Sequence, residues 1–292
     1  MEYDLINKKM VRKGKVWSSE YNNGKPYETN KIRSTASTLS QMPSHMQSRA
    51  ITISKLHNHV AISNNQGDIM IFEENDFSTC LTKLKHPQEW VEAIEYSPDS
   101  RFLAVGAHDD TIYIYKISTD GKYQLHYKIE HMHSSAVTAL DWSKDSKYLR
   151  AIDQAYAKMF YDITECVHIK DGMSVLTDPA IWETSTCKLG WYSNGVYRSG
   201  MDGSDINAID TNEEHTLIAA GDDSGTLCIY RYPARYNTHD CIRLGGHSSH
   251  VSKVRFYETG NPEEARILTA GGYDRSYIQW KQGGPSNQPD DE

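Results

Sequence analysis

The sequence predicts an all-β fold built from repeated units of short strands. The first observation is composition, because 19 of the 292 residues are Tyr and turn residues recur throughout, which favours strands. The second is the sequence pattern of the repeats, in which short alternating apolar runs are separated by the turn residues Asn, Asp and Gly. The third is spacing, since the third run of each repeat ends in an aromatic residue at intervals of 43, 46, 69 and 50 residues. These ends are Phe72, Tyr115, Tyr161, Tyr230 and Trp280.

The final repeat is the clearest copy of the unit. It opens with His247, and Asp274 lies six residues before Trp280. This arrangement, with a period of about 40 to 45 residues, is typical of a WD-repeat β-propeller blade, in which the three side chains meet in buried hydrogen bonds. The sequence therefore predicts a WD-repeat β-propeller of four-stranded blades. Five repeats are clear, and degenerate ones would raise the number of blades to six or seven.

The N-terminal part is predicted to contribute a strand and then an insertion. Residues 1–16 contain a strand candidate at 8–16. Because the last repeat supplies only three strands, we expect this strand to pair with its exposed edge and to close, or partly close, the propeller. Residues 17–48 are rich in Ser, Thr and Asn without a sustained period, and are expected to form a loop or partly disordered insertion.

Residues 49–281 are predicted to form the propeller itself. The third repeat has Ala155 where the turn Asp is expected, so its hydrogen-bond network should be incomplete. Residues 164–203 are irregular, which indicates an insertion or a degenerate blade, and residues 282–292 read as a disordered polar tail. The residues expected to form the structural hydrogen-bond networks are His86, Asp109, His133, Asp223, His247, Asp274 and Trp280.

Bulk composition argues against several classes of protein. No apolar run approaches the roughly 18 residues of a membrane helix, and the first residues lack the apolar centre of a signal peptide, so we expect a cytoplasmic protein without a membrane partner. The net charge of −8 argues against nucleic-acid binding. The five cysteines show no paired spacing, which indicates buried reduced thiols.

The sequence contains no motif typical of a metal, cofactor or catalytic site. The close histidine pairs lack the further ligands that a zinc site requires, so we predict no metal site and no cofactor. The recurring aspartates lie at turns, where a carboxylate accepts structural hydrogen bonds. No nucleophile elbow, phosphate loop or HExxH string occurs, and the sequence predicts no catalytic residue and no enzyme.

Several stretches resemble the C-terminal WD-repeat region of the echinoderm microtubule-associated protein-like (EMAP-like) family. The most family-specific one is the irregular stretch around Trp182 and residues 202–207. The resemblance implies a non-enzymatic scaffold that binds tubulin or microtubule-associated proteins in the cytoskeleton, a cilium or an axoneme. The chain has room for one propeller where long family members have two, which suggests a second propeller chain that completes the ring, or a tandem arrangement. The stretches that carry the resemblance are 96–118, 133–149, 204–230, 245–256 and 267–280.

Two groups of residues are candidates for partner binding. The first is a basic segment with a local net charge of +6 between Lys8 and Arg33, which leaves −14 for the remainder and would attract acidic tubulin surfaces. Its alternative is the solvated face of an edge strand. The second is an aromatic and arginine group that is equally consistent with burial. A general adaptor that recognises a short peptide, for example in a ubiquitin ligase, is the competing function. The candidates are Lys8, Lys9, Arg12, Lys13, Lys15, Tyr192, Tyr197 and Arg198.

Overall fold

The computed structural model describes residues 2–4, 9–12, 48–236, 240–257 and 266–281. Within these ranges the chain is all-β, and its strands form five sheets in two compact units. Among the described residues, helical structure is limited to three short segments, α2 (Gly172–Val175), η1 (Pro179–Ile181) and η2 (Asn194–Val196). The predicted insertion at 17–48, except for Ser48, and the predicted tail at 282–292 lie outside the described residues.

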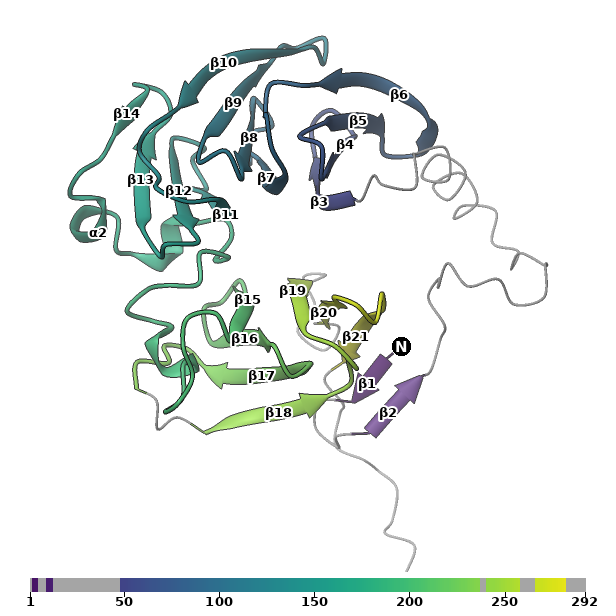
Figure 1. The fold of residues 1–292 in the computed structure, drawn as a ribbon, viewed down its shortest axis with the longest axis vertical. Coiled ribbons are helices and arrows are strands. Elements are labelled where there is room, and N and C mark those ends of the chain that lie inside the picture. The colour runs from purple at the N-terminus through teal and green to yellow at the C-terminus, as the bar shows by residue number, and fades with distance from the viewer. Residues whose placement is uncertain (1, 5–8, 13–47, 237–239, 258–265, 282–292) are drawn as a thin grey trace, which may run out of the picture. The chain divides into compact units, whose positions relative to one another are not determined.

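Residues Pro26–Cys187 form one unit, which contains three four-stranded antiparallel sheets (Figure 1). Within each sheet every strand pairs with the next one along the chain. In order, the strands are β3 (Ser48–Ser54), β4 (His59–Asn64), β5 (Ile69–Glu73) and β6 (Asp76–Leu84); β7 (Val91–Tyr96), β8 (Phe102–Ala107), β9 (Ile112–Ile117) and β10 (Tyr123–Ile129); β11 (Val137–Trp142), β12 (Tyr148–Asp153), β13 (Lys158–Asp162) and β14 (Val167–His168).

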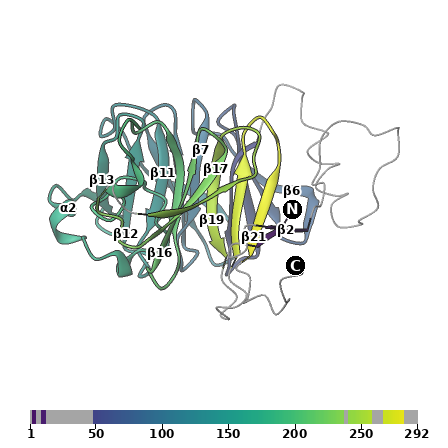
Figure 2. The same ribbon diagram turned by 90° about the horizontal axis from the view of Figure 1, so that it is seen from below.

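The strands of this unit differ in burial according to their position in the sheet. The second strand β8 is buried along nearly its whole length, whereas the fourth strand β10 alternates between half-buried and exposed residues. A strand covered on both faces reads as a continuous apolar run, and a strand with one face in water alternates. The first strands of neighbouring sheets contact one another, β3 with β7 and β7 with β11, so the sheets pack face to face as propeller blades do. Figure 2 shows the same ribbon, with β11, β12 and β13 labelled, after a turn of 90° about the horizontal axis of Figure 1.

Residues Met1–Lys25 and Lys188–Glu292 form the other unit, which contains two sheets. Its first strands, β15 and β19, contact one another. The strands are β15 (Ile206–Thr211), β16 (Leu217–Asp222), β17 (Thr226–Arg231) and β18 (Cys241–Gly245) in one sheet, and β19 (Val251–Tyr257), β20 (Arg266–Gly271), β21 (Tyr277–Lys281), β1 (Glu2–Asp4) and β2 (Lys9–Arg12) in the other.

An N-terminal strand completes the last sheet, as predicted, but it is not the predicted segment at 8–16. Strand β1 pairs in parallel with β21, with Tyr3 opposite Trp280. Strand β2, which falls in that segment, pairs with β1 and is the outermost strand of the sheet. The prediction took the longer apolar and basic run for the partner, whereas three residues at the start of the chain satisfy the backbone groups of β21.

The five aromatic residues that set the repeat spacing lie in the third strands β5, β9, β13, β17 and β21, and all are at most 2% exposed. The prediction that these residues belong to the third strands of the repeats is therefore confirmed. The long interval between Tyr161 and Tyr230 contains no additional sheet in the part of the chain that the structure describes. An all-β WD-repeat propeller fold with five blade sheets accounts for the described strands.

Candidate functional site

The last blade contains a chain of buried hydrogen bonds that runs through four side chains. Trp280 Nε1 donates to Thr269 Oγ1 over 2.9 Å, and Thr269 Oγ1 lies 2.8 Å from His247 Nε2. His247 Nδ1 lies 2.8 Å from Asp274 Oδ2. Since the carboxylate can only accept, His247 donates from Nδ1 and accepts the Thr269 proton at Nε2, so all four groups are satisfied. His247, Asp274 and Trp280 therefore belong to one network inside the blade, as predicted. Thr269, which joins His247 to Trp280, was not among the predicted residues.

The charge state of Asp274 follows from these contacts. Burial alone would raise its pKa, but the hydrogen bonds from His247 and from the Ser276 amide lower the pKa of this carboxyl below its ordinary value. Asp274 Oδ2 also accepts from the Ser248 amide over 3.2 Å. The carboxylate thereby holds the loop before β19 against the turn before β21.

The third blade builds a comparable network from a different aspartate. His133 Nδ1 lies 3.1 Å from Asp153 Oδ2, and the Tyr161 hydroxyl lies 3.0 Å from His133 Nε2. Asp153 Oδ1 accepts from the Ala157 amide over 2.9 Å, which holds the turn where Ala155 replaces the expected carboxylate. The expectation of an incomplete network is corrected, because the end of β12 supplies the carboxylate that the turn lacks.

Two of the predicted network residues lie elsewhere. His86 is exposed, and its Nδ1 contacts the Tyr115 hydroxyl at 3.1 Å, while Asp109 Oδ2 accepts from the Gln88 amide and the Tyr113 hydroxyl. The described contacts do not join His86 to Asp109, since His86 contacts Tyr115, whereas Asp109 holds Gln88 and Tyr113.

Asp223 is also exposed, and Asn207 donates to its Oδ1 over 2.7 Å. Its neighbour Asp222 is the buried residue, with an Oδ1 that accepts from the Ser224 and Thr226 amides. Asp222 has the same place in β16 as Asp153 in β12, opposite the first residue of the preceding strand. Asp223 follows the last residue of β16 and lies in the turn, so the prediction chose the residue next to the buried aspartate.

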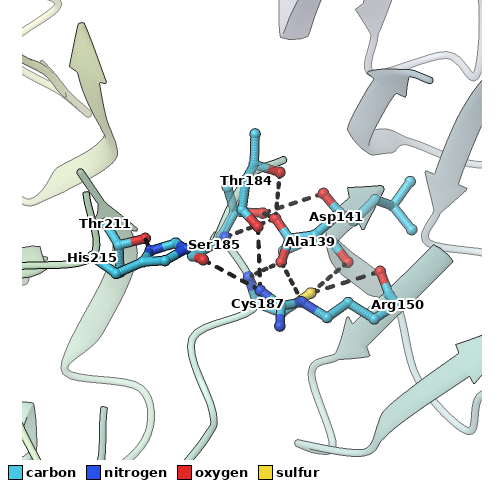
Figure 3. A network of polar contacts seen from close by, with 10 residues as sticks. Ala139, Asp141, Arg150, Thr184, Ser185, Cys187, Thr211 and His215 are labelled. Carbon is cyan, nitrogen blue, oxygen red and sulfur yellow. Dashed lines mark hydrogen bonds and ion pairs between the residues drawn. The ribbon is translucent and has the colours of Figure 1, made fainter. Parts of the chain in front are cut away.

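A buried charged cluster anchors residues 184–187, which follow Trp182 in the family-specific stretch (Figure 3). Asp141 of β11 accepts from Arg150 Nε over 2.9 Å, from the Thr184 hydroxyl over 2.6 Å and from the amides of Thr186 and Cys187. Although burial opposes ionisation, the charge of Arg150 and these donors hold the pKa of Asp141 well below its usual range. Segment 184–187 is therefore tied to β11 by one carboxylate.

The guanidinium of Arg150 extends this anchor to Trp182. It lies 4.3 Å from the Trp182 ring centre, and its terminal nitrogen donates to the Thr184 carbonyl over 3.2 Å. Burial and the charge of Arg150 lower the pKa of nearby Lys158 to about 8. In this unit, Arg150 and Trp182 thus help to hold the irregular segment 182–187 beside strand β11.

Of the three predicted contact residues after this stretch, one is buried and two are half-buried. Tyr192 is 4% exposed and belongs to an apolar core, so the prediction that it contacts a partner is corrected. Tyr197 and Arg198 are half-buried, and their role in partner binding stays a prediction. Lys9 and Arg12 lie in β2 without described side-chain positions, and Lys8, Lys13 and Lys15 lie outside the described residues.

The exposed aromatic surface is beside these residues, on what we call the aromatic–arginine patch: Trp191, Tyr232, Arg235 and Tyr236. The Arg235 guanidinium lies 4.8 Å from the Trp191 ring centre, and Trp191 meets Tyr232 edge to face at 6.4 Å. Trp191 is 40% exposed and Tyr236 is 67% exposed. The signal that could have found them is their composition, since Trp, Tyr and Arg are the residues enriched in interface hot spots.

Backbone pairing holds the patch in place. The Gly195 amide donates to the Ala234 carbonyl over 2.7 Å, and the Ala234 amide donates to the Tyr192 carbonyl over 2.8 Å. Gly195 is required there, because a Cβ would lie 2.3 Å from the Tyr236 carbonyl oxygen. The patch is therefore presented by two paired segments rather than by a single loop.

The described residues contain no group of three or more His, Cys, Asp or Glu side chains that converges on a metal position. Within the same residues, no helix has both the length and the apolar character needed to cross a membrane.

Comparison with known proteins identifies the family. A family model described as the echinoderm microtubule-associated protein second beta-propeller matches residues 30–282. The ciliary WD repeat-containing protein ctxp80 of Euplotoides octocarinatus is 32% identical over 96% of this chain and 37% of that protein. The 77 kDa echinoderm microtubule-associated protein of Strongylocentrotus purpuratus is 38% identical over 71% of this chain and 29% of that protein. Human echinoderm microtubule-associated protein-like 1 is 35% identical over 76% of this chain and 26% of that protein.

The chain spans about a quarter to two fifths of the length of these relatives. Strands β3 to β21 and the blade networks lie within the matched propeller region, whereas β1 and β2 precede it. The chain is a WD-repeat propeller, and it belongs to the EMAP-like family.

Proposed function

We propose that this chain is a protein-binding scaffold that associates with tubulin or microtubules, in the cytoplasm, as part of a cytoskeletal or ciliary assembly. Relatives named as microtubule-associated or ciliary proteins support the proposal, because they share the propeller that makes up most of this chain. The observation that carries it is the aromatic–arginine patch, since it is an exposed surface of interface composition.

The chemistry of the patch fits an acidic partner. The planar guanidinium of Arg235 can form paired hydrogen bonds with a carboxylate while it stacks on Trp191. The exposed Arg231 at the end of β17 adds positive charge nearby. Glutamate-rich tubulin tails offer the complementary charge, and the rings supply apolar contact at low entropic cost.

The basic N-terminal segment would act at longer range. Lys8, Lys9, Arg12, Lys13 and Lys15 would attract an acidic lattice and raise the association rate, while the charge of −14 on the remainder of the chain limits unspecific adhesion. This contribution should weaken with salt, because exposed charges more than about 10 Å apart are screened at 0.1 M ionic strength.

Co-sedimentation with polymerised tubulin tests the proposal. The wild-type chain should pellet with microtubules at low salt and less at 0.3 M salt. Trp191→Ala combined with Arg235→Ser should weaken binding by about tenfold or more, since hot-spot residues each contribute about 2 kcal/mol. Tyr273→Ala, which removes the most exposed aromatic ring of the same unit, is the matched control and should pellet like the wild type.

The basic segment is tested by a second variant, with Lys8, Lys9, Arg12, Lys13 and Lys15 changed to Ser. Unchanged pelleting of this variant at low salt would reject the electrostatic contribution. If the wild type fails to pellet and affinity capture recovers ubiquitin-ligase subunits without tubulin, the scaffold is a general adaptor and the proposal fails.

A further inference from the structure

A pocket of about 530 Å³ opens on the unit of residues 26–187, at the ends of two neighbouring blades. Three segments surround it: the turn between β4 and β5, the link from β6 to β7, and the turn after β8. Its lining residues are Asn65, Gln66, Gln88, Glu89, Trp90 and His108. None of the predicted partner-binding residues belongs to it.

Backbone contacts fix the walls of this pocket. The His108 amide donates to the Trp90 carbonyl over 2.8 Å, and the Gln88 amide donates to Asp109 Oδ2 over 2.9 Å. Gly67 has a φ of +79°, and a Cβ there would lie 2.5 Å from the Pro87 carbonyl oxygen, so the two walls approach each other as closely as glycine permits. The site is preformed, which lowers the entropic cost of binding a ligand.

One lining residue of the pocket, Trp90, already contacts a cation of this chain. The Arg49 guanidinium lies 4.2 Å from the centre of the Trp90 ring, although Trp90 is 44% exposed. An indole face attracts a cation through its quadrupole, and the attraction grows as the cation loses water. A guanidinium supplied by this chain therefore marks the Trp90 surface as a cation site.

The charges around Trp90 favour the same kind of ligand. Glu89 lines the pocket, and Glu92 Oε2 lies 2.6 Å from His108 Nε2 beside it. Asp109 and Asp110 follow in the same turn, and Arg49 is the positive side chain seated on the Trp90 ring. The amides of Asn65, Gln66 and Gln88 can meet the backbone of an extended peptide, since each carries both a donor and an acceptor.

We propose that this pocket binds a short peptide of a partner protein through an arginine side chain, which takes the place of Arg49 on Trp90. Arg49 is then an internal competitor that covers the site until the partner arrives. The site differs in sign from the surface proposed for tubulin, because it selects a basic ligand. It is therefore independent of microtubule binding.

The experiment uses the full chain and an immobilised library of twelve-residue peptides, with Arg, Lys, Gln or Glu fixed at the centre and random flanks. The wild type should enrich the Arg set over the Gln and Glu sets. Fluorescence anisotropy on enriched peptides then gives dissociation constants. Trp90→Ala and Glu89→Lys should each weaken binding by about tenfold, because one removes the stacking surface and the other reverses the charge.

The Arg49→Ala variant gives the sharpest outcome, because its effect has the opposite sign. Loss of the internal guanidinium should tighten peptide binding by about two- to fivefold, the equivalent of one exposed cation–π contact. Glu165→Lys is the charge-matched control on an exposed site of the same unit, and it should bind like the wild type. Thermal unfolding and the far-ultraviolet spectrum establish that each variant is folded.

Three results would overturn the proposal: no enrichment of Arg peptides by the wild type, equal affinity in a folded Trp90→Ala variant, or weaker binding after Arg49→Ala. Enrichment of the Glu set would likewise show that the pocket does not select a cation.

Discussion

Thr269 is the residue on which the buried hydrogen bonds of the last blade depend. Its hydroxyl accepts from Trp280 and donates to His247, so it joins two groups that the sequence marked separately. The sequence around Thr269 does not reveal this role, because threonine is common in strands for its β-propensity alone. Its function follows from its position between Trp280 and His247, which lie on two other segments of the blade.

Replacement of Thr269 by Val tests this role. The side chain keeps its shape but leaves the indole N–H and the imidazole Nε2 without partners in a buried site, which costs about 1–3 kcal/mol for each unsatisfied group. The free energy of unfolding, from urea titration, should fall by about 2 kcal/mol or more. Thr269→Ser keeps the hydroxyl and is the control, with an expected loss of about 1 kcal/mol for the missing methyl group. Equal losses in the two variants would contradict the relay.

His133 provides a second case in which burial sets the chemistry. Burial lowers its pKa below the ordinary value even though Asp153 acts in the opposite direction. The neutral ring satisfies both neighbours, because Nδ1 donates to Asp153 and Nε2 accepts from the Tyr161 hydroxyl. A proton added at Nε2 would remove the acceptor that Tyr161 uses.

The stability of the chain should therefore depend on pH through His133. The unfolded histidine binds a proton near pH 6.5, whereas the folded one resists it, so this stability is present above about pH 6.5 and is lost as the pH falls toward the lower folded value. Urea titrations at pH 7.5 and 5.5 should show a smaller difference for His133→Asn than for the wild type. His126→Asn changes an exposed histidine of the same unit and should keep the wild-type difference. A wild type with the same pH dependence as His133→Asn would refute this account.

At the scale of elements, the segment that ends at Cys187 shows how an irregular stretch can be held rigid. Asp141 lies on β11, and its carboxylate accepts side-chain and backbone donors from residues 184–187 as well as from Arg150. The sequence singled out the stretch around Trp182 by its resemblance to a family. Its anchor lies more than 40 residues earlier, in a strand that reads as an ordinary repeat.

Asp141→Asn keeps the size of the side chain but leaves Arg150 as a buried, uncompensated charge. The free energy of unfolding should fall by about 3–5 kcal/mol, the usual cost of removing one partner from a buried ion pair. Amide hydrogen exchange at residues 184–187 should accelerate before that of β11. Asp171→Asn removes the same charge from an exposed site of the same unit and should leave both measurements unchanged. Equal effects of the two substitutions would show that Asp141 is not the anchor.

Strand β1 is the second element whose role depends on a distant partner. It occupies the edge of β21, where unpaired backbone groups would otherwise be open to another chain. Deletion of residues 1–12 should speed amide exchange in residues 277–281 and promote self-association at high concentration. Exchange in β17, which lies inside its own sheet, serves as the internal reference. Unchanged exchange in β21 would mean that β1 does not protect this edge.

On the scale of the whole molecule, the two surfaces proposed for partners have opposite preferences. The aromatic–arginine patch offers positive charge and rings, and the Trp90 pocket offers carboxylates and a ring already occupied by a guanidinium. Each belongs to one compact unit, described by itself. The two proposals thus give the scaffold one surface for an acidic partner and one for a basic partner.

The two surfaces should respond independently to substitution. Trp191→Ala should reduce microtubule pelleting and leave the binding of Arg peptides unchanged, whereas Trp90→Ala should do the reverse. Both assays on both variants, with the wild type as reference, give the comparison. A loss of both activities in either folded variant would show that one surface serves both partners.

The sequence by itself determined the all-β class, the repeat spacing and the third strand of every blade, because these follow from a local alternation of apolar residues and turns that neighbouring residues impose. It also placed His247, Asp274 and Trp280 in one blade. Only the tertiary structure decided that Asp222 and not Asp223 is buried, that Tyr192 is buried while Trp191 is exposed, and that β1 completes the last sheet. These outcomes depend on which face a residue presents and on which distant strand lies beside it, and a linear pattern does not contain that information.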